Sequence, residues 1–255
     1  MMKKEAIPRI TKRCIPGVTL HPRDGYYQIR HIGLTAQRVK TDPAFHNTRR
    51  EARKFTQIVK VAKTINDALF RTGGIKKTLP RLITLVKKAF NTGTAGEAYT
   101  GNPAEAGWEL LQNFEGDPAN PWHAAISVTP GIQVVPQQQQ FIVTFPAIIP
   151  ASVIHPPPDI AHCRIYTLCA TIDINNLTYS TQKARTTIIP CCNSTIQLKP
   201  LMTNVKKEEG QLHLLAIGVE WYSRDNPGNS LQRSDWPAIV RLTHTLVTPK
   251  TLKKD

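Results

Sequence analysis

Four residues near the middle of the chain have side chains that metal ions prefer: His155, Asp159, His162 and Cys163. Imidazole, carboxylate and thiolate groups bind zinc and similar ions in proteins. However, the prolines at 156–158 stiffen this segment, and no second ligand pair follows at a useful spacing. A proline-rich loop that enters a strand explains the same pattern. The pattern of these four residues therefore does not decide whether they bind a metal ion. Because the proline-rich loop explains the pattern equally well, we predict no bound metal or cofactor.

The usual signatures of a catalytic site are missing from the sequence. Cys191 and Cys192 are adjacent, so they lack the two-residue gap of common metal-binding and redox pairs and are expected to be thiols at a strand end. No serine or cysteine lies in a glycine-flanked turn that would expose a nucleophile. The glycines at 73–74, 93 and 96 lack the lysine and the spacing of a phosphate-binding loop. Scattered acids are expected at the surface and not as a catalytic pair: Asp173, Glu208, Glu209 and Glu220. We therefore expect a protein that is not an enzyme.

Positive charge is concentrated in the first third of the chain. The 255 residues carry a formal net charge of +15. Residues 1–90 hold 21 Lys and Arg against 5 Asp and Glu, whereas residues 91–255 hold 12 against 13. Such segregation indicates either an anionic partner or a complementary surface on a neighbouring copy.

Two basic helices are predicted within residues 42–115, and their connection predicts a helical hairpin. Asp42 can cap the first helix, and Pro43 suits its first turn. Apolar residues then recur every three or four positions, which predicts one buried stripe. That stripe includes Phe45, Phe55, Val59 and Ile65. The glycines at 73–74 end this helix, and the second begins between 75 and 79. A third, short helix is expected after the Asn102-Pro103 pair, through Trp108 and Leu111.

The basic side chains of these helices are the candidate sites for an anionic partner. Lys and Arg neutralise phosphates and release counterions, which gives an affinity that falls with salt. No helix-turn-helix, zinc-finger or ribonucleoprotein signature accompanies them, so a solvated basic face is the alternative. The candidates are Arg49, Arg50, Arg53, Lys54, Lys60, Lys63, Lys76, Lys77, Arg81, Lys87 and Lys88.

The stretch over residues 42–55 reads D-P-A-F-H-N-T-R-R-E-A-R-K-F. It resembles a protein family of Bacteroidota whose members carry a pattern close to D-P-A-F-x-x-T-R-E-N-x-x-E-F, followed by a basic helix. The likeness covers most of the chain and includes residues 215–222. Here Arg50 and the pair Arg53-Lys54 replace more acidic or neutral residues, so this copy is unusually basic. The family has no established activity, so the resemblance implies an architecture and no mechanism.

From about residue 120 the sequence changes to short, β-rich apolar runs separated by prolines. Alternation of apolar and polar residues with a period of two is typical of half-buried strands. Strands are predicted over 124–128, 141–149, 163–174, 177–186, 212–222 and 238–246, with a turn at 175–176. Seven or eight strands without intervening helices predict an immunoglobulin-like sandwich that folds without the rest of the chain.

The predicted fold class is α+β, in three parts. An extended arm over residues 1–41 precedes the basic helical region over 42–115, and the β-sandwich domain follows over 120–255. No apolar run reaches the roughly 20 residues of a membrane-spanning helix. The basic N-terminus is not followed by the apolar stretch of a signal peptide, and the five cysteines do not form a disulfide pattern. The expected location is the cytoplasm, including as part of a larger particle.

The leading functional hypothesis is a structural or assembly protein that forms a homo-oligomer or filament. Its arm and helices would bind other copies of the same chain, because a basic and a near-neutral part can meet head to tail. The alternative is a protein that binds nucleic acid independently of sequence through the basic helices.

Overall fold

The computed structural model describes residues 18–23, 26–31, 35–72, 75, 78–92, 106–135, 140–158, 160–204, 211–223 and 239–247. The chain forms two compact units, Met1–Phe55 and Thr56–Asp255. The described part combines helices with two larger antiparallel sheets, which confirms the predicted α+β class. None of the described helices is long and apolar enough to cross a membrane.

The first unit contains a two-stranded antiparallel hairpin followed by helices. The strands are β1 (Val18–Arg23) and β2 (Tyr26–His31). The helical elements are α1 (Ala36–Thr41), the 3-10 turn η1 (Pro43–Phe45) and the first half of α2 (His46–Ile65).

Helix α1 corrects the prediction of an arm without helix over residues 1–41. The hydroxyl of Thr35 accepts a hydrogen bond from the backbone N–H of Arg38 at 3.2 Å. This N-cap satisfies a helix amide that would otherwise have no partner, so the helix begins six residues before Asp42. Residues 1–17 of the predicted arm lie outside the described part of the chain.

In the second unit α2 continues directly into the π-helical segment η2 (Asn66–Arg71). The helix α3 (Leu79–Thr92) and the 3-10 helix η4 (Trp108–Leu111) come next in the chain. Helix α3 begins at Leu79, within the predicted range of 75–79, and Pro80 lies in its first turn, where a missing N–H breaks no helical hydrogen bond. The predicted glycine turn at 73–74 and the start of the third helix at 102–103 lie outside the described residues.

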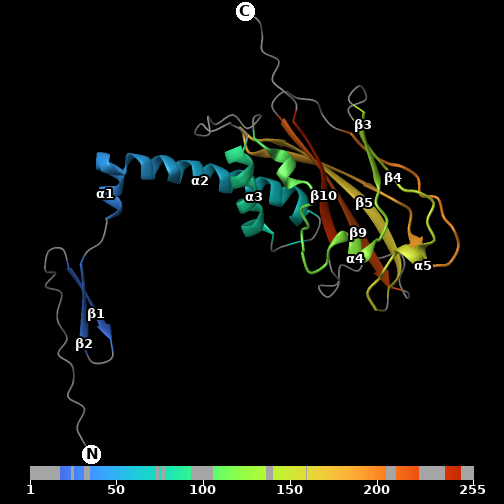
Figure 1. The fold of residues 1–255 in the computed structure, drawn as a ribbon, viewed down its shortest axis with the longest axis horizontal. Helices are drawn as coiled ribbons and strands as arrows, with labels where there is room; N and C mark the ends of the chain where they lie inside the picture. Colours follow the sequence, from blue (N-terminus) through green and yellow to red (C-terminus); the bar gives the residue numbers. More distant parts are fainter. Residues whose placement is uncertain are drawn as a thin grey trace, which may run out of the picture. The chain divides into compact units, whose positions relative to one another are not determined.

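Two antiparallel sheets form the rest of the second unit. The five-stranded sheet has the order β10 (Ile239–Val247), β9 (Gln211–Ser223), β5 (Ile160–Asp173) and β6 (Thr178–Arg185), and β7 (Ile189–Pro190) also pairs with β5. The three-stranded sheet has the order β3 (Gly131–Val135), β4 (Gln140–Thr144) and β8 (Leu201–Asn204). Figure 1 shows β5, β9 and β10 running alongside one another through the body of this unit.

Four of the predicted strands are confirmed, and two are wrong in whole or in part. The predictions over 163–174, 177–186, 212–222 and 238–246 correspond closely to β5, β6, β9 and β10. The predicted strand over 124–128 is wrong, because residues Trp122–Ala125 form the short helix α4 and only Ile126 makes an isolated β-bridge. The predicted strand over 141–149 ends at Thr144 in β4, and the short helix α5 (Pro150–Val153) follows. Alternation alone does not distinguish a strand from one helical turn in so few residues.

The predicted turn between β5 and β6 is built around Asp173. Its carboxylate accepts hydrogen bonds from the backbone N–H groups of Asn176 at 3.0 Å and Asn175 at 2.9 Å. The Asn176 N–H is the largest of the contributions that hold the pKa of Asp173 below its usual value. Leu177 then turns the chain into β6 with a φ of 56°. The turn at 175–176 is therefore confirmed.

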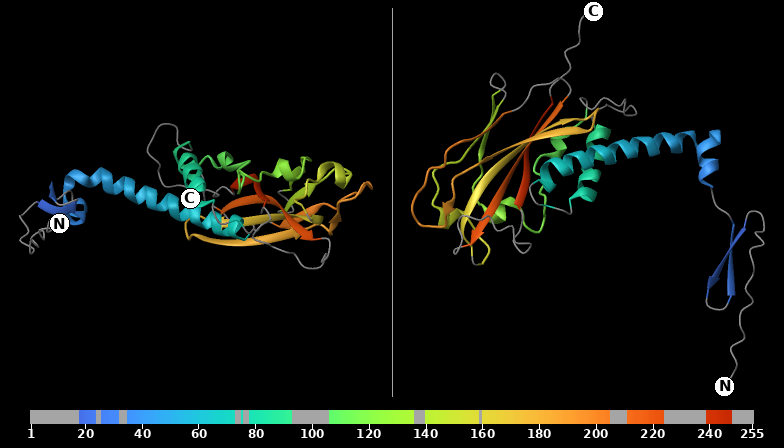
Figure 2. Two further views of the ribbon diagram at one scale, coloured as in Figure 1. Left: turned by 90° about the horizontal axis from the view of Figure 1, so that it is seen from below. Right: turned by 180° about the vertical axis from the view of Figure 1, so that it is seen from behind.

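Strands β5 and β9 are buried on both faces, and each face belongs to a different core. One face, with Tyr166, Leu168 and Leu214, packs against the helices between Ile58 and Phe114. The opposite face, with Cys163, Ile165 and Ile217, packs with β4 and β8 of the three-stranded sheet. Figure 2 shows the helices meeting the five-stranded sheet in both of its views. Residues of the helices between Ile58 and Phe114 thus share a single core with residues of β5 and β9.

The buried stripe predicted for α2 is correct only for its second half. Ile65 is fully buried, and Val59 is half-buried. Phe55, in contrast, is 50% exposed, and Phe45 is half-buried. The described core contacts of α2 begin at Ile58, in the second half of the helix. The prediction that Phe55 is buried is therefore wrong for a single copy of the chain.

One titratable side chain, His213 of β9, lies fully buried between the sheets. Its Nδ1 lies 3.1 Å from the hydroxyl oxygen of Thr171, and burial lowers the pKa of His213 from 6.5 to about 4. Between pH 6.5 and about pH 4, His213 is protonated in the unfolded chain and neutral in the folded chain. A fall in pH through this range therefore favours unfolding. We expect this residue alone to remove about 3 kcal/mol of stability between pH 6.5 and pH 4, and nothing above pH 6.5.

Denaturant unfolding at pH 7 and pH 4.5 measures this loss. The carboxyl groups titrate over the same range, so the comparison is with His213→Leu, which lacks only the imidazole. The variant is expected to lose clearly less stability than the wild type over this interval. An equal loss in both proteins would show that His213 is not the group responsible.

Candidate interaction surface

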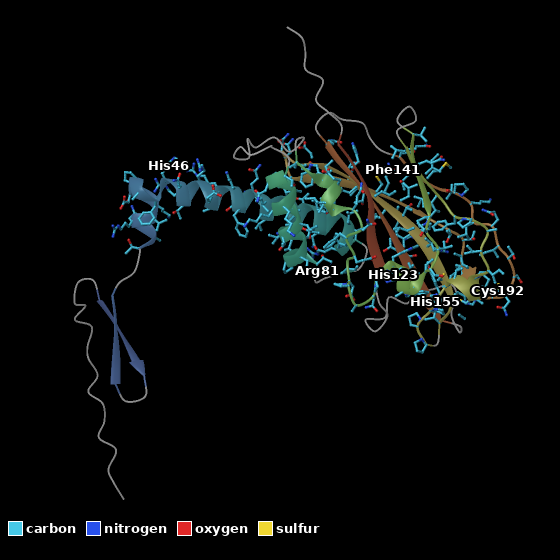
Figure 3. The ribbon with its side chains drawn as sticks, in the orientation of Figure 1. His46, Arg81, His123, Phe141, His155 and Cys192 are labelled. Atoms are coloured by element: carbon cyan, nitrogen blue, oxygen red, sulfur yellow. The ribbon has the colours of Figure 1, made fainter. Side chains whose placement is uncertain are left out.

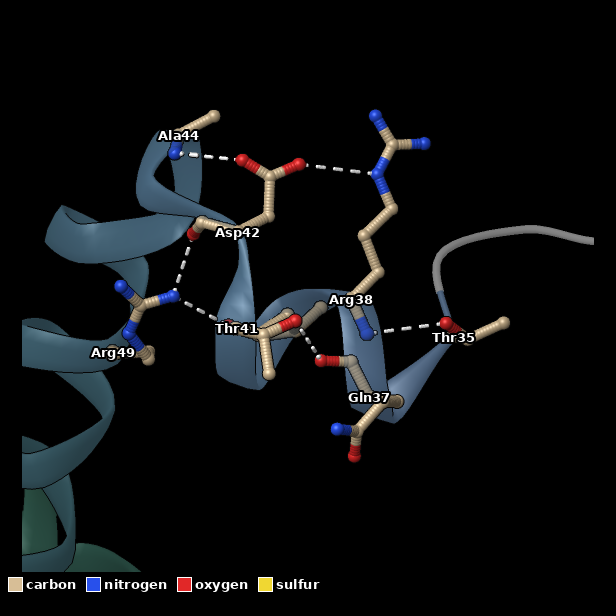
Figure 4. A network of polar contacts seen from close by, with 8 residues as sticks. Thr35, Gln37, Arg38, Thr41, Asp42, Ala44 and Arg49 are labelled. Atoms are coloured by element: carbon tan, nitrogen blue, oxygen red, sulfur yellow. Dashed lines mark hydrogen bonds and ion pairs between the residues drawn. The ribbon is translucent and has the colours of Figure 1, made fainter.

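A network of hydrogen bonds fixes the junction of α1, η1 and α2 (Figure 4). Asp42 Oδ1 accepts a hydrogen bond from the backbone N–H of Ala44 at 3.0 Å, and Asp42 Oδ2 lies 3.2 Å from Arg38 Nε. The bond from Ala44, followed by that from Arg38, holds the pKa of Asp42 below its usual value. Pro43 occupies the first position of η1. The Asp-Pro start predicted from the sequence is confirmed.

Arg49 closes the same junction from α2. Its Nη1 donates hydrogen bonds to the carbonyl oxygens of Asp42 at 2.7 Å and Val39 at 2.8 Å. Two carbonyls at the end of α1 are thereby satisfied by a charged donor, which makes these bonds stronger than neutral ones. The candidate residue Arg49 therefore holds α1 and α2 together.

Two other basic side chains of α2 share the carboxylate of Glu51. Lys54 Nζ lies 3.4 Å and Arg50 Nε lies 3.7 Å from Glu51 Oε1. The side chains of Arg50 and Glu51 are more than half exposed, at 55% and 62%. Exposed ion pairs contribute about 0–1 kcal/mol, so Glu51 offsets the local positive charge without fixing either partner strongly.

The three remaining candidates on α2 are exposed and lie on one side of the helix. Arg53 and Lys60 are seven residues apart, which is two turns, and Lys63 follows three residues later. Within the described residues, none of the three lies within ion-pair distance of a carboxylate. This side of α2 therefore carries uncompensated positive charge.

Exposed apolar residues lie beside this charge. Ala52 is exposed, and Phe55, almost one turn further along α2, is 50% exposed. Two residues at a spacing of three lie on one side of a helix. The side chain of Arg53 points to a different side of the helix, so α2 is exposed on more than one side between residues 52 and 55. We refer to Ala52, Arg53 and Phe55, all in the first unit, as the exposed α2 segment. It combines a half-exposed aromatic ring with a guanidinium group that has no carboxylate partner among the described residues.

The basic residues of α3 are arranged differently. Arg81, labelled in Figure 3, donates a hydrogen bond from Nη1 to the carbonyl oxygen of Gly116 at 3.2 Å, and its Cζ lies 4.7 Å from the centre of the Phe114 ring. It therefore fastens the loop after η4 to α3. Lys87 and Lys88 are exposed, while the candidates Lys76 and Lys77 lie outside the described residues.

The residues considered for a metal site do not converge. His162 and Cys163 are neighbours in β5, so their side chains point to opposite faces of the sheet, and Cys163 is buried in the core between the sheets. His155 lies in an exposed loop (Figure 3), and Asp159 lies outside the described residues. Within the part that the structure describes, no three His, Cys, Asp or Glu side chains are grouped to hold a metal ion.

The described cysteines have the properties of structural thiols. Burial raises the pKa of Cys163, Cys169 and Cys191, in the case of Cys169 to about 12. A nucleophilic or metal-binding cysteine requires the opposite shift, toward the thiolate. The protonated thiol is therefore favoured in all three, and Cys191 directly follows β7 (Ile189–Pro190), at the strand end expected from the sequence.

Sequence reasoning missed the role of Glu220, which it treated as a scattered surface acid. Its Oε1 lies 2.6 Å from Lys183 Nζ and 3.5 Å from Arg185 Nε, and its Oε2 accepts a hydrogen bond from the Tyr222 hydroxyl at 3.2 Å. Burial raises the pKa of Glu220, but Lys183, Arg185 and Tyr222 together bring it below its usual value. Lys183 also covers the ring of Tyr166, with 3.8 Å from Nζ to the ring centre. An acid inside the apolar run 212–222 was the available signal, because such a charge requires partners.

Comparisons with protein-family models, curated proteins and solved structures find no match to this chain. The function must therefore be inferred from the arrangement of the side chains. Three features are available for that inference: the fixed junction at Asp42 and Arg49, the exposed α2 segment, and the uncompensated charge along α2.

Proposed function

We propose that this chain is a non-enzymatic assembly protein that binds copies of itself through its N-terminal region and α2. The observation that carries the proposal is the exposed α2 segment. Phe55 leaves half of its side chain in contact with water on a helix whose second half packs into a core. An aromatic residue contributes most to association when its ring enters a partner, so this position suits an interface.

The junction at Asp42 supports the same proposal. A helix end without tertiary contacts frays, because isolated helical turns are marginally stable in water. Here the bonds from Arg49 to the Val39 and Asp42 carbonyls hold the first turns of α2 in place. An ordered surface loses less conformational entropy when it binds a partner. The motif that resembles the Bacteroidota family supplies both Asp42 and Arg49, so we also propose that the family shares this junction.

The finer architecture forms part of the proposal. The two antiparallel sheets share one core, which suits an immunoglobulin-like sandwich, and the β1–β2 hairpin suits an arm that reaches a neighbouring copy. A cytoplasmic location, as part of a homo-oligomer or filament, fits the basic composition and the buried thiols of high pKa.

A second candidate function is binding to nucleic acid independently of sequence. The side of α2 with Arg53, Lys60 and Lys63 favours it, since free basic side chains along a helix neutralise phosphates. The described part of α2 offers no comparable row of aromatic rings for base stacking, so the expected affinity is electrostatic and falls steeply with salt.

Size-exclusion chromatography with light scattering, combined with the ratio of absorbance at 260 and 280 nm, distinguishes the two functions. We expect freshly purified protein to form a particle of several chains that contains no nucleic acid. Reversal of Arg53, Lys60 and Lys63 to Glu is expected to dissociate it, because the reversed charges oppose the partner's surface. Arg49 is left unchanged, since its loss would break the junction.

The matched control reverses Lys87 and Lys88 on α3, which are also exposed, and should leave the particle intact. Nucleic acid that co-purifies with a monomer, and binding to random duplex DNA whose logarithmic salt slope falls by about one unit per lost phosphate contact, would support the second function instead. A monomer without nucleic acid would contradict both.

A further inference from the structure

Polar side chains occupy one end of the helix-facing side of the five-stranded sheet. On this face of β5 the helical core begins at Tyr166. Residues two apart in a strand point to the same face, so the two side chains that precede it there are Arg164 and His162. The opposite positions on β9 are Glu220 and Tyr222, respectively. We refer to these four residues, His162, Arg164, Glu220 and Tyr222, as the β5–β9 patch.

Two nitrogen atoms of the β5–β9 patch are buried and have no hydrogen-bond partner among the described residues. They are Arg164 Nε and His162 Nδ1. A buried polar group without a partner costs free energy, so such a group in a folded protein points to a bound ion or water molecule. Both residues are nevertheless partly exposed, so the pair lies at the surface and not inside the core. A ligand can therefore approach the pair from solvent.

The charge of Arg164 is not neutralised by the acid opposite it. Glu220 instead pairs with Lys183 at 2.6 Å and with Arg185 at 3.5 Å, and within the described residues it makes no ion pair with Arg164. The guanidinium of Arg164 lies over the ring of Tyr222, with 5.5 Å from Cζ to the ring centre. A guanidinium above a ring keeps its N–H groups at the rim of its plane, where an anion can accept hydrogen bonds from them. Arg164 is therefore positioned to bind an anion.

The β5–β9 patch and its neighbours on β6 carry a surplus of positive charge. Their three cations are Arg164, Lys183 and Arg185, and their one described carboxylate is that of Glu220, so two positive charges remain. The side chain of Arg185 is 50% exposed, so the surplus reaches the surface. A phosphate group carries a charge of about −1.5 to −2 near neutral pH and has three strong acceptor oxygens. Its charge matches the surplus, whereas a carboxylate would balance only half of it.

We propose that His162 and Arg164 form the centre of a binding site for a phosphate dianion, either free phosphate or the terminal phosphate of a small molecule. Rotation of the Arg164 side chain presents Nε–H and one Nη–H to two phosphate oxygens, which is the bidentate geometry that suits a guanidinium group. Nδ1 of His162 donates a hydrogen bond to a third oxygen, and the charge of Arg185 adds attraction. All three residues belong to the second unit, and the inference does not depend on the proposed self-assembly.

Isothermal titration calorimetry of the full chain with inorganic phosphate tests the site. Mildly alkaline pH keeps phosphate a dianion, and a constant concentration of sodium chloride screens weak binding to the basic helices. We expect one phosphate to bind per chain. Arg164→Gln, which removes the charge and the paired donors, is expected to weaken binding at least roughly tenfold. Arg164→Lys keeps the charge without the paired donors and is expected to weaken binding roughly fivefold.

A second residue and a control separate this site from general attraction by charge. His162→Phe keeps a ring and removes both ring nitrogens, so binding roughly tenfold weaker is expected. The control is Lys199→Gln, which should bind as the wild type does. Lys199 is exposed, and its neighbour Leu198 packs in the core on the other side of the sheet. Thermal unfolding without phosphate checks that each variant folds. Arg185→Gln, at a half-exposed position, replaces any variant that does not fold, with a weakening of roughly threefold expected.

A wild type that binds no phosphate would overturn the inference. Unchanged binding in Arg164→Gln and His162→Phe would also overturn it, because the phosphate would then lie elsewhere, for example on the basic helices. An equal loss in Lys199→Gln would reduce the effect to net charge and would have the same consequence. A parallel titration with phenyl phosphate distinguishes the two sources of the ligand. Tighter binding of inorganic phosphate supports a site for the free ion, and equal or tighter binding of phenyl phosphate supports a site for a phosphate carried by a small molecule.

Discussion

A fragment that begins at Asn120 is expected to lose cooperative unfolding, whereas one that begins at Thr56 is expected to keep it. In the full chain one face of β5 and β9 packs against the helices, with Leu168, Ile172 and Leu212 fully or almost fully buried there. Removal of the helices would expose this face to water at about 25 cal/mol for each Å² of apolar surface. A domain whose net stability is about 5–15 kcal/mol does not tolerate such a loss.

Circular dichroism during thermal unfolding distinguishes the two fragments. The fragment of residues 56–255 should show one sharp transition, and that of residues 120–255 should aggregate or unfold gradually. The pattern of short strands predicted that residues 120–255 fold alone, and the shared core gives the opposite expectation. A sharp transition in the shorter fragment would restore the boundary at residue 120.

Phe70→Ala is expected to destabilise the chain by roughly 3–5 kcal/mol. Phe70 lies in the π-helical segment η2, is 1% exposed, and meets the ring of Phe114 edge to face with 5.2 Å between ring centres. Its removal leaves a cavity in the core that the helices share with the five-stranded sheet, and a cavity adds to the lost transfer free energy. Denaturant unfolding at a protein concentration below that of self-association measures the loss.

Phe55→Ala provides the matched control on the same continuous helical stretch. This ring is 50% exposed, so its removal should change the stability of a single chain by no more than about 0.5 kcal/mol. Self-association should nevertheless weaken, since the ring belongs to the exposed α2 segment. Equal destabilisation by both substitutions would show that Phe55 is buried within one chain and would remove the main support for the proposed function.

The sequence was sufficient to predict elements with a strong local signal. The cap at Asp42, the start of α3 at Leu79, and the long strands β5 and β9 all follow from local chemistry or from extended apolar runs. The burial of Phe55 was not predictable in the same way. Its spacing from Val59 and Ile65 continues the apolar stripe, but burial depends on contacts with residues distant in the sequence, and no local pattern carries that information.

The candidate surface was predicted in its composition and not in its details. Periodicity placed the basic residues on one helix, yet it could not show that Arg49 binds the carbonyls of Val39 and Asp42, because those bonds depend on the turn at η1. The network around Glu220 joins β5, β6 and β9, so it depends on strand register, which the sequence does not state.

The position of β9 has a consequence for how the chain is made. This strand lies in the middle of the five-stranded sheet and completes both cores, yet it begins at Gln211, more than 100 residues after α3 ends. At ribosomal rates of about 5–20 residues per second, the apolar faces of α2 and α3 wait several seconds or longer for their partner. Transiently exposed apolar surface of this kind favours aggregation, and folding of both cores is expected to finish only once β9 has left the ribosome.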